Sequence, residues 1–142
     1  MEVTYHGKEK SKTWFYTDGI AIGMDAGNGA SGVIIGRSAG VGVTGGCNVI
    51  LGIGTAATLT TGVRNIIIGD LADVAAPGDD DKLVIGNGVN TLISGSMADS
   101  TLQAHGAFSV ANAAGTVQYT LPTVAGTIGQ FLTSNAAGEA TW

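Results

Sequence analysis

The chain has 142 residues, of which 24 are glycine, 2 are proline and 44% are apolar. Glycine does not recur at every third position and proline is scarce, which excludes collagen. Long helices are disfavoured as well, because glycine costs about 1 kcal/mol per helical site. Charged residues make up 12% of the chain and the formal net charge is -5, so the chain lacks the excess of cations that neutralises nucleic-acid phosphates. We therefore expect a folded all-β protein, rich in turns, that does not bind nucleic acid.

Residues 1–18 have a composition of their own. They contain Lys8, Lys10 and Lys12, followed by an aromatic cluster at 14–16. Terminal segments of repeat proteins commonly act as caps, so we predict either a cap on the repeats that follow or a segment that docks to a larger particle. The chain shows no signal-peptide pattern and no apolar run of 18 residues, from which we expect neither export nor membrane insertion.

Residues 19–95 contain five apolar tetrads that each end in glycine, at 20–23, 33–36, 49–52, 66–69 and 83–86. Successive tetrads are 13, 16, 17 and 17 residues apart, a period that suits one coil of a small β-roll or β-solenoid. Glycine turns a tight corner without the steric cost of a Cβ atom. The predicted corner residues are Gly23, Gly36, Gly52, Gly69 and Gly86. The sequence thus predicts about five short coils.

Both faces of each tetrad are apolar. In a strand, the first and third residues point to one face and the second to the other, and strands covered on both sides read as continuous apolar runs. We predict that the first and third residues fill the roll interior: Ile20, Ile22, Val33, Ile35, Val49, Leu51, Ile66, Ile68, Leu83 and Ile85. We predict that the second residues form a trimer interface: Ala21, Ile34, Ile50, Ile67 and Val84.

The intervals between the tetrads should close each coil. Weaker return strands are predicted at 41–43, at 57–59 and around 73–74. Asn48 and Asn65 each open a tetrad, and we expect their side-chain amides to stack and to form hydrogen bonds between coils.

Residues 96–142 are predicted to form a C-terminal β-meander. Short strand patterns at 108–110, 116–121, 130–133 and 140–142 are separated by turns rich in glycine, alanine and asparagine. No Asp, Glu, Lys or Arg occurs between Ser100 and Gly138.

Catalytic and metal-binding patterns are mostly absent. His6 and His105 stand at opposite ends of the chain, and the single cysteine, Cys47, is expected to be a small turn or core residue. The candidate calcium ligands are Asp70, Asp73 and Asp79. A solvated turn after Pro77 explains these acidic residues equally well, so we predict no metal, no cofactor and no catalytic residue, and the chain is not expected to be an enzyme.

Two stretches resemble known families. The element Asn-Val-Ile-Leu-Gly at 48–52, repeated as Asn-Ile-Ile-Ile-Gly at 65–69, resembles the head repeat of trimeric autotransporter adhesins, which form a trimeric left-handed β-roll; related repeats occur in bacteriophage fibres. Residues 121–142 are similar to a segment common in phage tail-fibre proteins. The adhesins also need a signal peptide, a coiled-coil stalk and a membrane barrel, and the sequence shows none of them. The resemblance therefore implies a phage particle.

The resemblance implies a homotrimeric virion protein, a tail fibre or spike that takes part in attachment to the host surface and assembles in the host cytoplasm. Its expected partners are copies of itself, tail, baseplate or capsid proteins, and a host glycan or other receptor. A trimeric capsid decoration protein or head fibre is the alternative. A third hypothesis, a carbohydrate-binding surface module, is disfavoured because no aromatic residue occurs between Thr17 and Ala107.

Overall fold

The computed structural model describes residues 13–15, 19–27, 31–88, 90–111, 114, 117–121, 126–127, 129–134 and 140–141. By their contacts the residues form two compact units, Met1–Gln103 and Ala104–Trp142. Every regular element among the described residues is a strand, which confirms the all-β prediction.

The first unit contains one eight-stranded sheet in the order β1 to β8. Its strands are β1 (Thr13–Phe15), β2 (Gly19–Ile22), β3 (Gly32–Ile35), β4 (Asn48–Leu51), β5 (Ile66–Ile68), β6 (Lys82–Asn87), β7 (Asn90–Ser96) and β8 (Thr101–Ala104). Strands β2 to β6 pair in parallel, tetrad against tetrad. Strand β1 is antiparallel to β2, and β7 is antiparallel to β6. The basic stretch with Lys8, Lys10 and Lys12 lies outside the described residues.

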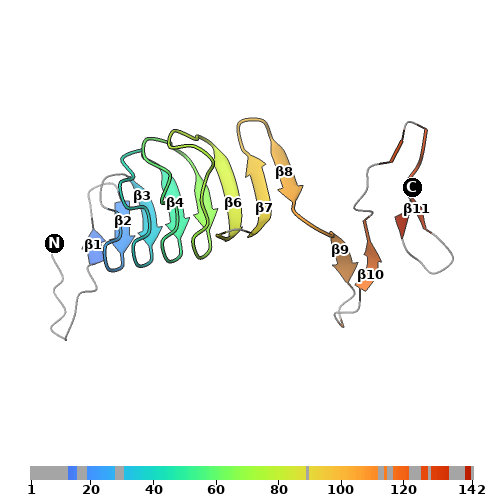
Figure 1. Ribbon diagram of the computed structural model, residues 1–142, viewed down its shortest axis with the longest axis horizontal. Helices are drawn as coiled ribbons and strands as arrows, with labels where there is room; N and C mark the ends of the chain where they lie inside the picture. Colours follow the sequence, from blue (N-terminus) through green and yellow to red (C-terminus); the bar gives the residue numbers. More distant parts are fainter. Residues whose placement is uncertain are drawn as a thin grey trace. The chain divides into compact units, whose positions relative to one another are not determined.

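The parallel strands belong to a β-solenoid. After each of β2 to β5 the chain turns a corner, runs back beside the sheet and enters the next strand, as the stacked loops in Figure 1 show. The β-roll prediction is confirmed, with about four turns in place of five coils. The difference arises because β6 continues directly into the antiparallel strand β7, so the fifth tetrad has no return segment.

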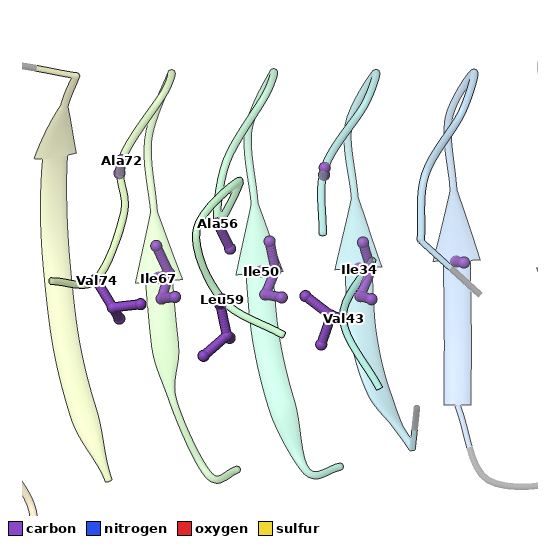
Figure 2. Close-up of a cluster of buried hydrophobic side chains, with 10 residues drawn as sticks. Ile34, Val43, Ile50, Ala56, Leu59, Ile67, Ala72 and Val74 are labelled. Atoms are coloured by element: carbon purple, nitrogen blue, oxygen red, sulfur yellow. The ribbon is translucent and has the colours of Figure 1, made fainter. Parts of the chain in front are cut away.

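A narrow core lies inside the coils. Figure 2 shows the middle residues of the tetrads, among them Ile34, Ile50 and Ile67, facing side chains from the return segments. The return segments contribute Ala39, Val43, Ala56, Leu59, Ala72 and Val74, all buried. The predicted return strands at 41–43, 57–59 and 73–74 are turns or irregular segments instead of strands, although each of them ends on one of these core residues.

The corner glycines let the coils stack closely. Gly36 and Gly52 follow β3 and β4 with φ of 143° and 140°, a conformation that residues with a Cβ atom rarely adopt. A Cβ atom on Gly36 would collide with the carbonyl oxygen of Gly52, and one on Gly52 with that of Gly69. Gly23 and Gly69 have the same relation to the following coil. The corner column therefore has room only for glycine.

Asn48 and Asn65 form a buried amide ladder, which confirms the predicted stacking. Asn65 Nδ2 donates to Asn48 Oδ1 at 3.1 Å and to the carbonyl oxygen of Asp79 at 2.7 Å. Asn65 Oδ1 accepts the backbone N–H of Lys82 at 2.8 Å, and Asn48 Nδ2 donates to Gly45 and Gly62 carbonyl oxygens at 2.9 Å. Both asparagines are almost fully buried, so their amides serve backbone groups that water does not reach.

The second unit consists of short antiparallel pairs. Strand β9 (Ser109–Ala111) pairs with β10 (Val117–Thr120), and β11 (Thr133–Ser134) pairs with β12 (Ala140–Thr141). Each of these four strands overlaps one of the predicted strands. In place of one continuous meander, the described residues form two separate two-stranded sheets.

The amide ladder predicts a specific loss of stability. We expect Asn65→Ala to lower the free energy of unfolding by about 2–4 kcal/mol, because the carbonyl of Asp79 and the N–H of Lys82 lose their buried partner. Asn90→Ala is the matched control, since Asn90 is exposed on β7, and its effect should stay within about 0.5 kcal/mol. Urea denaturation at one fixed protein concentration measures both. Equal effects would show that the ladder does not stabilise the coils.

Candidate association surface

The outer face of the sheet carries two unbroken rows of apolar side chains. In-register pairing aligns the first tetrad residues in one row and the third residues in another. The rows are Ile20, Val33, Val49, Ile66 and Leu83, and Ile22, Ile35, Leu51, Ile68 and Ile85. Neighbouring strands lie about 4.8 Å apart, so successive side chains in a row lie side by side and form one apolar strip.

This face is open in the single chain. Ile20, Ile22 and Ile35 are 38%, 36% and 39% exposed, and the other seven residues of the two rows are half-buried. The return segments pack against the opposite face of the sheet, where the middle tetrad residues point. None of the ten residues is charged or polar, so nothing in the rows favours contact with water.

This arrangement reverses the predicted assignment of the two faces. Ala21, Ile34, Ile50 and Ile67 are at most 3% exposed in one chain, and Val84 packs against the same core, so the residues predicted as a trimer interface form the roll interior. The ten residues predicted as interior instead form the outer rows. The coil is narrow, and its interior holds one tetrad side chain per strand against alanine, valine and leucine side chains of the return segments.

In the sequence, Asn48 is the residue that identifies the inner face. Residues two apart in a strand share a face, so Asn48 and Ile50 point the same way, as Asn65 and Ile67 do. An amide ladder that satisfies backbone groups between coils must lie inside the roll. Ile50 and Ile67 must therefore lie inside with it.

The acidic residues after β5 form hydrogen bonds to backbone amides. Asp73 Oδ2 accepts the N–H of Thr58 at 2.7 Å, and Asp79 Oδ2 accepts the N–H of Ala76 at 2.8 Å. Asp80 Oδ1 accepts the N–H of Val63 at 2.7 Å. No cluster of three or more His, Cys, Asp or Glu side chains within metal-binding reach occurs among the described residues, and Asp70, the third candidate ligand, is exposed. The carboxylates of Asp73 and Asp79 thus have a structural use within and between coils.

Arg64 and Asp81 form a bidentate ion pair between the corners that precede β5 and β6. Arg64 Nε donates to Asp81 Oδ1 at 2.6 Å, and Arg64 Nη2 donates to Oδ2 at 2.7 Å. Hydrogen bonding to the guanidinium lowers the pKa of the Asp81 carboxyl below its usual value. Both residues have positive φ, of 58°, and they stack in one column with the exposed Cys47, whose φ is 61°. Ser31, which precedes β3, contacts Cys47 in this column.

The ion pair gives a testable pH dependence. A carboxyl whose pKa is lower in the folded chain than in the unfolded chain stabilises the fold above the unfolded pKa and loses that effect as the pH falls through the folded value. We expect NMR titration to give Asp81 a pKa below that of an unpaired aspartate, and Arg64→Gln to raise it to the ordinary range. Lys82→Gln is the control and should move it less, because Lys82 acts only through charge. An Asp81 pKa that Arg64→Gln does not change would contradict the pairing.

Comparison with known proteins adds no family to this description. The chain matches no family model, no curated protein and no solved structure. Among the described residues, no helix is long and apolar enough to cross a membrane.

Proposed function

We propose that the chain is a homotrimeric structural protein of a bacteriophage particle, a tail fibre or spike that takes part in attachment to the host surface. The observation that carries the proposal is the apolar outer face of β2–β6. Contiguous apolar patches of this kind are rare on soluble monomers and mark interaction surfaces. Sheets of parallel strands are usually covered on both faces, and here the described residues of one chain cover only one of them.

A copy of the same chain is the partner that this face fits best. The two rows run the full width of the parallel sheet, without a charge that would select an oppositely charged partner. Closed rotational symmetry lets identical surfaces cover one another without leaving a growing end. The choice of three copies rests on the resemblance of the repeats at 48–52 and 65–69 to trimeric β-roll heads.

The proposed mechanism is mechanical and adhesive. Three rolls packed through their outer faces would make a rod whose sheets are covered on both sides. One end would dock to tail, baseplate or capsid proteins, and the other would present loops to a host glycan or other receptor, where three weak contacts add by avidity. Assembly would take place in the host cytoplasm, and the mature protein would reside in the virion.

A capsid decoration protein or head fibre is the second candidate, because the same trimer suits a threefold site on a capsid. Cryo-electron microscopy of purified particles, with an antibody against this chain, separates the two locations. Label at the tail tip or baseplate supports the fibre or spike. Label on the capsid supports the alternative, and particles without the chain would contradict both.

The outer rows predict which substitution dissociates the assembly. We expect Ile35→Asp to convert the protein from three chains of 14.1 kDa to one, because a charge in the row would be buried without a partner between copies. Val41→Asp is the matched control, since Val41 is 52% exposed but lies in a return segment. Native mass spectrometry measures the number of chains per assembly in both variants. A wild-type chain that is monomeric would contradict the proposal.

A charge at an inner position and a charge at an outer position should have different effects on folding and assembly. Ile50→Asp places a charge in the core of a single coil, where Ile50 is 0% exposed, so we expect loss of the β-sheet signal in circular dichroism along with loss of assembly. Ile35→Asp should keep that signal. If Ile50→Asp folds normally and only dissociates, the inner and outer faces have been assigned the wrong way round.

A further inference from the structure

Beyond β6 the sheet loses its second layer. Strands β6, β7 and β8 follow one another as simple hairpins, whereas loops lie beside β2 to β5 (Figure 1). In the coils, return-segment residues such as Leu59 and Val74 cover the inner face. Val74 is the last buried side chain of the chain as far as the structure describes it. Among the described residues, β7 and β8 therefore have no buried side chain.

The hairpin nevertheless exposes three large apolar side chains among mostly polar ones. Leu92 on β7 is 62% exposed, Leu102 on β8 is 70% exposed, and Met97 in the turn between them is 45% exposed. Asp99 is the only Asp, Glu, Lys or Arg between Leu83 and Gly138. Apolar side chains that gather on the surface of a soluble protein mark an interaction site. The three exposed side chains therefore favour a covering partner.

The outer rows lead onto the hairpin. Ile93 on β7 pairs with Ile85 and extends that row of the association surface, whereas Gly95, which pairs with Leu83, continues the other row without a side chain. Copies that associate through these rows must bring their β7 strands close to one another. Symmetry then places equivalent β7–β8 hairpins, which carry almost no charge that would repel, around the same axis.

We infer that β7 and β8 pack against the same hairpins of the other copies, and that this contact covers Leu92 and Leu102. The inference rests on the proposed self-association of the chain. It divides the first unit in two: β2–β6 build their core within one chain, whereas β7 and β8, although β7 pairs with β6, resist local opening only when copies assemble. The hairpin thus couples folding to assembly and favours complete assemblies over single chains.

Hydrogen–deuterium exchange on the full-length protein tests the inference together with native mass spectrometry. In the wild-type assembly, amides of 90–104 should be protected. Leu102→Asp should speed their exchange by roughly tenfold or more, while amides of 48–68, the internal control for folding, stay protected. Val41→Asp, at a similarly exposed position on the roll, should leave both segments as in the wild type. If the single chain were the whole structure, neither substitution would change exchange, because both side chains already face water.

The monomeric variant supplies the second arm of the test. In the Ile35→Asp monomer, the amides of 48–68 should stay protected from exchange. The amides of 90–104 should exchange freely, because the hairpins of the other copies no longer cover them. Protected amides at 90–104 in this monomer, or freely exchanging amides there in the wild-type trimer, would overturn the inference and leave the trimer intact. A monomeric wild-type chain would overturn both proposals, and the measured mass distinguishes that outcome from the others.

Discussion

In-register parallel pairing of β2–β6 determines the position of the tetrad side chains in the roll. Because tetrad residue pairs with tetrad residue, each position in the repeat becomes a column along the stack: a corner of glycines, an inner column that includes Ile34, Ile50 and Ile67, and two outer apolar rows. Carbonyl oxygens of the next coil fill the space that a Cβ would need at the corner. The close stacking therefore depends on glycine at a few positions and on small or β-branched residues between them.

The same geometry limits what one chain can bury. The roll interior accepts one tetrad side chain per strand, so two of the three apolar residues in each tetrad remain outside. A small protein already buries a low share of its surface, and burial of these rows would contribute about 25 cal/mol for each Å² of apolar surface removed from water. We propose that self-association supplies that burial. In the proposed assembly, the hairpin after β6, which has no buried side chain of its own among the described residues, would gain burial in the same way.

Tetrad spacing and strand periodicity predict the coil, its corners and the two sets of facing residues. They do not say which set is inside, because both sets are apolar and periodicity is symmetric between the faces. Asn48 breaks that symmetry: its amide must serve backbone groups between coils, and it shares a face with Ile50. The return segments were harder to predict, because Val43 and Leu59 reach the core from turns without a strand pattern. Nothing in the fifth tetrad indicates that β6 continues directly into β7, because this tetrad ends in glycine like the others.

Hydroxyl-radical footprinting of the native full-length protein tests most directly whether the outer rows are covered by other copies. Ile35 is 39% exposed and Val41 is 52% exposed in a single chain, so the two side chains should be oxidised at similar rates if the chain acts alone. Coverage of the rows predicts that Ile35 and its neighbours Ile22 and Leu51 are protected while Val41 reacts freely. Oxidation of Ile35 at the rate expected from its single-chain exposure would contradict the account.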